Sequence, residues 1–112
     1  MFIMITMNIH QKLERFYMEN SDHYFYVLTC KDGSLYGGYT NNLERRIKLH
    51  NEGKGAKYTR GRGPVELTYY RSYENKGDAL RAEYSFKQLS RKKKDEFLIK
   101  ETGDVYVAAK KL

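Results

Sequence analysis

The sequence predicts an α+β fold in which a three-stranded antiparallel sheet is flanked by helices, in the order β-β-α-β-α-α. Three observations support this prediction. Aromatic and β-branched runs alternate with helix-like segments, an Asp-Gly turn joins the first two runs, and asparagine or serine precedes each helical segment. A chain of 112 residues is long enough for one domain with one modest core.

The first two strands are expected to form a hairpin. Residues Tyr24 to Cys30 (YFYVLTC) are aromatic and β-branched, which is typical of a buried strand. Residues 31–34 (KDGS) have the composition of a turn, and Leu35 to Thr40 (LYGGYT) supplies the returning strand. A third strand, Val65 to Tyr73 (VELTYYRSY), follows Pro64.

Three helices are predicted from cap signals and hydrophobic spacing. They are Leu43 to Asn51 after Asn41 or Asn42, a second from Asn75 or Asp78 through Leu89, and a third of roughly Arg91 to Glu101 after Ser90. Gly53 is suited to end the first helix. This order gives the predicted β-β-α-β-α-α domain.

The two ends of the chain are weakly patterned. Residues 1–22 contain all four methionines and show no clean period, so they are expected to be a frayed extension with Met18 as an alternative start. The folded domain is expected over residues 23–100 and a tail over residues 101–112.

Composition indicates a polyanionic partner. The chain has 21 Lys and Arg against 14 Asp and Glu, a net charge of +7 and a pI near 9.4, which favours nucleic acid first and an anionic membrane surface second. No run approaches the ~18 apolar residues that span a bilayer, so no membrane partner is expected. The single Cys30 excludes an internal disulfide. A cytosolic monomer without a small-molecule cofactor is the expected form.

Several chemically capable residues follow one another at set intervals, namely Tyr24-Phe25-Tyr26, Tyr36-Gly37-Gly38, Arg46, His50 and Glu83. Their order and spacing resemble the pattern of the GIY-YIG nuclease superfamily. The segments GKGAKYTRGRGPVEL and ALRAEYSFKQLSRKKK are similar to those of the small stand-alone GIY-YIG proteins of bacteria. The motif departs from its name at Tyr24, Phe25 and Gly37, which replace a glycine and two isoleucines.

The resemblance implies divalent-metal-dependent hydrolysis of DNA phosphodiester bonds. Either Tyr26 or Tyr36 would act as the base, and the sequence leaves open which. Arg46 would hold a phosphate and His50 would transfer a proton. Glu83 would bind Mg²⁺ or Mn²⁺ with water as the other ligands.

Each of these residues also has a structural explanation. Tyrosines pack well in strands. His50 shares a helical stripe with Leu43 and Ile47, where it would be a half-buried packing residue. Glu83 would form an ion pair with Lys87 or Arg46.

The loop after the first helix is expected to contact nucleic acid, DNA rather than RNA. Its basic and aromatic residues are Lys54, Lys57, Tyr58, Arg60 and Arg62. Basic side chains and backbone amides bind phosphates, and Tyr58 would stack on a base or line the catalytic pocket. The alternative is a mobile loop that only confers solubility.

Two other functions compete with the nuclease. One is a non-catalytic nucleic-acid-binding module. Many active members of the superfamily carry an asparagine shortly after the helix of the metal-binding glutamate, whereas no asparagine follows Asn75 here, and no separate DNA-binding domain is present. The other is a protein-interaction module that recruits a larger nuclease.

Overall fold

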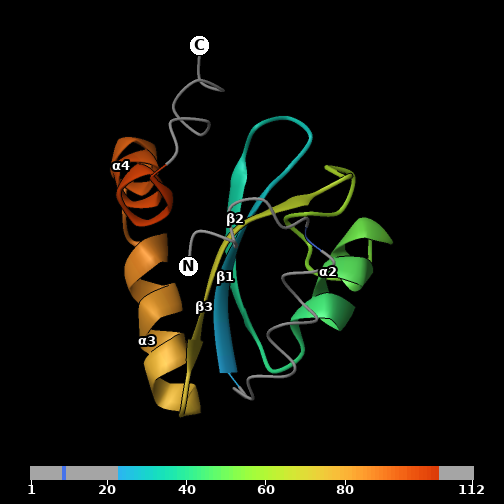
Figure 1. The fold of residues 1–112 in the computed structure, drawn as a ribbon. Helices are drawn as coiled ribbons and strands as arrows, with labels where there is room; N and C mark the ends of the chain where they lie inside the picture. The colour runs from blue at the N-terminus through green and yellow to red at the C-terminus, as the bar shows by residue number, and fades with distance from the viewer. Residues whose placement is uncertain (1–8, 10–22, 104–112) are drawn as a thin grey trace.

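The computed structural model describes residue 9 and residues 23–103 as a sheet between two helical layers (Figure 1). The elements are β1 (His23–Thr29), β2 (Leu35–Thr40), α2 (Leu43–Asn51), β3 (Glu66–Tyr73), α3 (Lys76–Lys87) and α4 (Arg91–Thr102). Their order confirms the predicted fold class. Apart from residue 9, the expected N-terminal extension lies outside the described residues, as does the tail from residue 104 onward.

The hairpin strand β1 lies at the centre of the sheet. Strand order is β2-β1-β3, and both neighbours of β1 are antiparallel to it. Tyr26 is therefore placed opposite Gly38 on one side and Tyr70 on the other. Six of the seven residues of β1 are buried, which explains why this strand is a nearly continuous apolar run instead of an alternating one.

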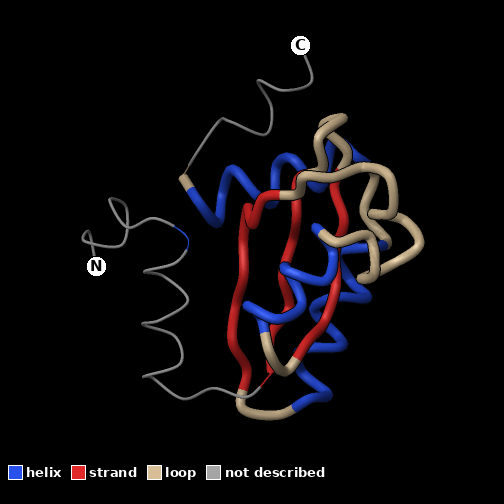
Figure 2. Tube along the Cα trace, turned by 90° about the vertical axis from the view of Figure 1, so that its right-hand side faces the viewer, coloured by secondary structure: helices blue, strands red, loops and turns tan. Residues whose placement is uncertain are grey.

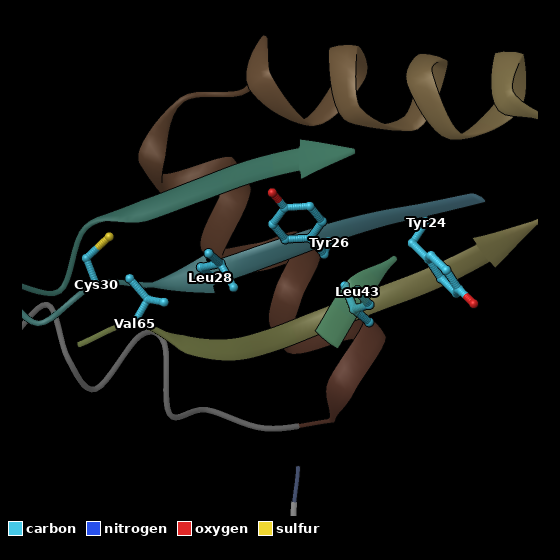
Figure 3. Close-up of a cluster of buried hydrophobic side chains, with 6 residues drawn as sticks. All are labelled: Tyr24, Tyr26, Leu28, Cys30, Leu43 and Val65. Carbon is cyan, nitrogen blue, oxygen red and sulfur yellow. The ribbon is translucent and has the colours of Figure 1, made fainter. Parts of the chain in front are cut away.

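Alternate residues of β1 enter two different cores. Tyr24, Tyr26 and Leu28 point to the α2 side, where they pack with Leu43 and other buried residues (Figure 3). On the α3 and α4 side the buried cluster is Phe25, Val27, Leu35, Phe86 and Leu98. Figure 1 shows α2 on one face of the sheet and both later helices on the other.

Five boundaries differ from the sequence prediction by one or two residues. Strand β1 begins one residue earlier than predicted, at His23, and ends one residue earlier, at Thr29. It ends there because the Cys30 amide already bonds the Ser34 carbonyl in the turn, at 2.8 Å. Strand β3 begins at Glu66, since the Val65 amide donates to the Asn51 side chain at 2.7 Å.

The last two helices also end differently. Helix α3 stops at Lys87 instead of Leu89, because the chain tightens to a Leu89-to-Phe86 backbone bond before the next cap. Helix α4 continues to Thr102, one residue beyond the prediction, and ends at Gly103 in the left-handed conformation.

The three helices begin at side-chain caps as predicted. Asn42, Asn75 and Ser90 each accept a hydrogen bond from the amide three residues later. The turn of residues 30–34 and the loop of residues 52–65 lie together at one end of the sheet (Figure 2), joined by the Lys31 amide and the Arg62 carbonyl at 2.9 Å. No helix in the described part of the chain is long and apolar enough to cross a membrane.

Candidate active site

A buried hydrogen-bonded chain joins β1, α2 and the basic loop. The Tyr26 hydroxyl lies 2.8 Å from His50 Nε2, and His50 Nδ1 lies 2.8 Å from Thr59 Oγ1. Thr59 uses its only proton to donate to the Ala56 carbonyl at 3.1 Å. His50 Nδ1 must therefore carry the proton that Thr59 accepts, and Nε2 accepts the proton of Tyr26. The network fixes one neutral tautomer of the imidazole.

Burial shifts the pKa of both rings. His50 is 1% exposed, and burial together with the Arg46 charge lowers its pKa to about 4. Burial also raises the pKa of the Tyr26 phenol above its ordinary value, while the nearby Arg46 guanidinium opposes that rise. At neutral pH both rings are uncharged, as their shared hydrogen bond requires.

Two glycines leave the space that these rings occupy. A Cβ on Gly38 would lie 2.5 Å from the Tyr26 hydroxyl. A Cβ on Gly55 would overlap the His50 ring and its Cα. Figure 3 shows the Tyr26 hydroxyl directed toward β2, where Gly38 lies opposite it in the register. Gly38 therefore lets the phenol lean over the edge strand.

Arg46 is held in place yet keeps a free donor. One terminal nitrogen donates to the Gly55 carbonyl at 2.8 Å. Its Nε is buried and has no hydrogen-bond partner among the described residues. A buried guanidinium N–H without a partner is costly unless a ligand accepts from it. Because Arg46 is also close enough to shift the pKa of Tyr26 and His50, that donor lies at the predicted site.

Tyr36 lies in a column of rings at the edge of the sheet. Its ring centroid is 5.1 Å from that of His50 and 5.9 Å from that of Tyr58, on which it stacks. The Arg62 guanidinium covers Tyr58 at 4.5 Å. Tyr36 is half-buried, and its hydroxyl has no hydrogen bond within the described part of the chain. Of the two candidate phenols, Tyr36 is therefore the one with an available hydroxyl.

Glu83 is connected to this column of rings by Lys87, which pairs with Glu83 and lies over Tyr36. The Lys87 ammonium lies 2.8 Å from the Glu83 carboxylate and 5.6 Å from the centre of the Tyr36 ring. The Glu83 side chain is 18% exposed, and its charge helps to raise the pKa of Tyr26. The ion pair with Lys87, one of the two alternatives left by the sequence, is thus formed.

One carboxylate with water is a donor set that Mg²⁺ uses, so Glu83 fits a divalent ion. No cluster of three or more His, Cys, Asp or Glu side chains able to hold a metal occurs in the described residues. Any divalent ion here would take most of its ligands from water and substrate.

The basic loop divides into two parts. Lys54, Lys57 and Arg60 are exposed, as a nucleic-acid contact requires. Arg62 is instead paired with Asp32 at 2.9 Å, so it braces the loop against the hairpin turn. Tyr58 is 42% exposed and lines the ring column, one of the two positions expected for it.

Sequence reasoning missed three contributors, namely Thr59, Gly55 and Lys87 in its contact with Tyr36. Thr59 and Gly55 lie in a loop whose path no periodicity predicts, although two closely spaced glycines after a helix signal an unusual backbone. Lys87 was expected only as a partner of Glu83. Its position four residues beyond Glu83 was the signal that the two share a helix face.

Comparison with known proteins identifies the domain. Residues 22–96 match the model of the GIY-YIG catalytic domain. A UPF0213 protein of Bacillus licheniformis is 60% identical over 81 residues, which cover 72% of this chain and 84% of the relative. A UPF0213 protein of Bacillus cereus is 57% identical over 94 residues, 84% of this chain and 96% of the relative.

Two solved structures are also similar. The solution structure of a UPF0213 protein from Bacillus halodurans shares 53% identity and a TM-score of 0.50, covering 80% of this chain and 95% of that one. A protein from E. faecalis shares 46% identity and a TM-score of 0.53, covering 76% and 91%. The chain therefore belongs to the GIY-YIG catalytic domain family, among its small stand-alone bacterial UPF0213 members.

Proposed function

We propose that this chain hydrolyses phosphodiester bonds of DNA with the help of a divalent metal ion. The observation that carries the proposal is that all five predicted catalytic and metal-binding side chains meet at the edge strand β2. Side-chain contacts link Tyr26 to His50, His50 to Tyr36, and Tyr36 through Lys87 to Glu83. Arg46 lies beside the first two of these rings. Family membership supports a nuclease-type reaction at this cluster.

Arg46 is proposed to hold the scissile phosphate. Arg46 is half-buried, and its bond to Gly55 fixes the plane of the guanidinium before the substrate arrives. The guanidinium donors that face solvent can then bond a phosphate oxygen. A fixed cationic donor stabilises the negative charge that grows on the phosphate oxygens as water attacks. Preorganisation of this kind is a major source of catalytic power.

Tyr36 is proposed to be the base. Hydrolysis forms a P–O bond to the attacking water oxygen and breaks the P–O bond to a sugar oxygen. One proton passes from the water to the base, and the departing sugar oxygen takes a proton from the base or from solvent. The hydroxyl of Tyr36 has no hydrogen-bond partner among the described residues, which supports Tyr36 as the group that takes that proton. The Lys87 ammonium lies 5.6 Å from the centre of its ring. Tyr26 is fully buried and engaged with His50, so it cannot meet the water directly.

Tyr26 and His50 are proposed to position the site instead of touching substrate. Their hydrogen bond ties the centre of the sheet to α2, and the bond from His50 to Thr59 ties α2 to the basic loop. Arg46 lies one turn before His50 on the same helix. The two hydrogen bonds of His50 therefore also fix the position of Arg46 relative to the sheet. The proton-transfer role first expected of His50 is therefore assigned to no step.

Glu83 is proposed to hold the metal ion, which when bound neutralises charge on the transferring phosphate. The ion pair with Lys87 has to open for the carboxylate to bind a metal. Once released, the Lys87 ammonium is available to the same phosphate. Lys87 thus competes with the metal for Glu83, and it also adds positive charge to the site.

The first test is cleavage of duplex, branched and single-stranded DNA by the full chain, in Mg²⁺, in Mn²⁺ and in chelator. Glu83→Gln keeps the shape of the side chain but loses the charge. We expect metal-dependent cleavage by the wild type and a loss of at least about a hundredfold in the variant. Unchanged cleavage in chelator or in the variant would contradict the metal assignment.

A second test measures metal binding without turnover. Broadening of amide resonances by Mn²⁺ is expected around Glu83 in the wild type and to be absent in Glu83→Gln. Lys87→Met removes the competing ammonium while keeping a side chain of similar length. This variant is expected to bind Mn²⁺ about two- to fivefold more tightly, since an exposed ion pair contributes up to about 1 kcal/mol. Equal or weaker binding would show that Lys87 does not compete with the metal.

A non-catalytic nucleic-acid-binding module is the second candidate. The Glu83–Lys87 ion pair favours it, because a carboxylate already neutralised by lysine needs no metal. That module would bind DNA equally with or without metal, and Glu83→Gln would leave its affinity unchanged. Salt-sensitive binding with no cleavage of any substrate would select it over the nuclease.

A further inference from the structure

We propose that a hollow between the start of α2 and the start of α3 binds a backbone phosphate of the substrate, remote from the phosphate that is cleaved. This inference rests on the proposed function for its nucleic-acid substrate. The hollow measures about 280 Å³. It is lined by Tyr39, Thr40, Asn41, Asn42, Arg45, Arg46, Leu49 and Lys76.

The charges around this hollow suit an anion. Arg45, Arg46 and Lys76 line it, and no carboxylate does. Asp78, the acid nearest to Lys76 along α3, has one carboxylate oxygen bonded to Arg81 and the other to the Asn75 amide group. Its charge is therefore already compensated. Arg45 and Lys76, from two helices, are the cationic side chains assigned to the remote phosphate, and Arg46 lies at the border with the cleaved phosphate. No carboxylate is among the lining residues, as expected for a phosphate subsite.

The walls of the hollow are held in place. The Lys76 ammonium lies 5.6 Å from the centre of the Tyr39 ring, and the Tyr39 hydroxyl is bonded to His23 Nδ1 at 2.8 Å. Lys76 is thus positioned over an aromatic face at the end of β2, which limits the freedom of an otherwise exposed lysine. A prearranged cation loses less entropy when it binds a phosphate.

Arg46 connects the hollow to the catalytic cluster. It lines the hollow and also lies beside Tyr26 and His50. Helix α3 likewise passes from one to the other, with Lys76 near Tyr39 at one end of β2 and Lys87 near Tyr36 at the other. One strand of nucleic acid following the β2 edge would therefore meet both positions.

The distance between Lys76 and Glu83 along α3 determines which DNA phosphate would lie in the hollow. Seven residues separate Lys76 from Glu83, which at a rise of 1.5 Å per residue is about 10 Å along the helix axis. One strand of a duplex rises about 3.4 Å per nucleotide along the axis. Its phosphates are further apart than this rise, because the strand also winds around the axis. The hollow therefore lies about one to two nucleotide steps from the metal position. The bound phosphate is expected at that distance from the cleaved one.

The test measures DNA affinity in chelator with Glu83→Gln as the background, so that no hydrolysis interferes. Lys76→Ala is compared with Lys100→Ala, which removes an equal charge from the last turn of α4. We expect Lys76→Ala to weaken binding about three- to tenfold and to reduce the slope of log affinity against log salt by about 1. Lys100→Ala should change affinity less than about twofold.

The position of the contact is tested by replacing single phosphates of the DNA with neutral methylphosphonates. In the Glu83→Gln background, affinity should fall at a site about one to two steps from the phosphate that the wild type cleaves. With Lys76→Ala added, that sensitivity should disappear. Both results together support the subsite, and folding of each variant is checked by its amide spectrum.

Three outcomes would overturn the inference. One is equal affinity and salt slope for Lys76→Ala and Lys100→Ala, and another is no DNA binding at all. The third is a shift of the Tyr39, Thr40 and Lys76 amides with inorganic phosphate but not with DNA, which would make the hollow a site for a small free anion. DNA binding is measured without metal, so it is independent of cleavage. If Lys76→Ala weakens binding as expected but the wild type cleaves no DNA, the proposed hydrolysis is wrong and the phosphate subsite stands.

Discussion

The two faces of the sheet differ in chemistry although the same strand supplies the centre of both. On the α3 and α4 side, β1 contributes Phe25 and Val27 to a cluster whose other buried members are Leu35, Phe86 and Leu98. On the α2 side it contributes Tyr26 to a network of phenol, imidazole and threonine hydroxyl. Apolar burial stabilises the first face, whereas the second buries polar groups that need partners.

This difference shows how a small domain separates stability from chemistry. Strand alternation sends successive side chains to opposite faces, so neighbouring residues in sequence serve different purposes. Gly37 and Gly38 show most clearly that adjacent residues contact opposite faces of the sheet. A Cβ on Gly37 would press on Phe86 at 3.0 Å, and one on Gly38 would press on Tyr26. The comparison therefore predicts that mutations on the two faces will affect different measurements.

The largest expected effect is on the apolar face. Phe86→Ala removes a ring that packs against Phe25 and Phe97 at centroid distances of 5.5 and 5.6 Å. We expect a loss of about 3–5 kcal/mol in the free energy of unfolding, measured by urea denaturation. Phe86→Leu should recover a large part of that loss. A loss below about 1 kcal/mol for Phe86→Ala would show that this face is not the stabilising one.

The next largest effect is a pH dependence of the free energy of unfolding, which arises from His50 on the α2 side of the sheet. Burial lowers the pKa of His50 to about 4, against about 6.5 when unfolded. Between these values the unfolded chain binds a proton that the folded chain excludes, so stability falls as the pH drops from 6.5 to 4. The loss attributable to His50 is at most about 3 kcal/mol.

Urea unfolding at a series of pH values measures this loss, and His50→Gln should flatten the slope in that window. Nitrogen NMR of the wild-type imidazole should show Nδ1 protonated and Nε2 bare. The same slope in the variant, or the opposite tautomer, would refute the assignment of the buried network.

The smallest expected effect compares the two faces of the sheet at the adjacent positions Gly37 and Gly38. Gly37→Ala and Gly38→Ala each overfill a packed region, which costs about 1–3 kcal/mol. Gly38→Ala should in addition displace the Tyr26 ring and break its bond to His50, moving the His50 Nε2 resonance. Gly37→Ala should leave that resonance in place. Identical NMR changes in the two variants would mean that the faces are not independent.

Most of the fold followed from local patterns in the sequence. Helix caps, the Asp-Gly turn and the aromatic runs are each recognised from a few adjacent residues. Together they gave the correct order of the strands and helices from β1 to α4. The boundary errors arose where a distant group intervened, as where the Asn51 side chain takes the Val65 amide.

The site was predictable only in part. Motif spacing singled out Tyr26, Tyr36, Arg46, His50 and Glu83 as candidates, and the structure brings their side chains together near β2, Glu83 through Lys87. Spacing could not distinguish the buried Tyr26 from the available Tyr36, because that difference depends on which phenol leans over Gly38 toward the interior. Nor could it predict Thr59 as the partner of His50, since the loop path is a tertiary property.

The measurement that tests the central claim most directly is the cleavage rate of Arg46→Lys against Arg81→Lys. Both variants keep the positive charge but lose the planar guanidinium fork, and Arg81 is 73% exposed on α3. With saturating DNA and Mn²⁺, the account predicts a loss of about a hundredfold for Arg46→Lys and wild-type turnover for Arg81→Lys. Wild-type turnover in Arg46→Lys would contradict the claim that the α2 face carries the chemistry.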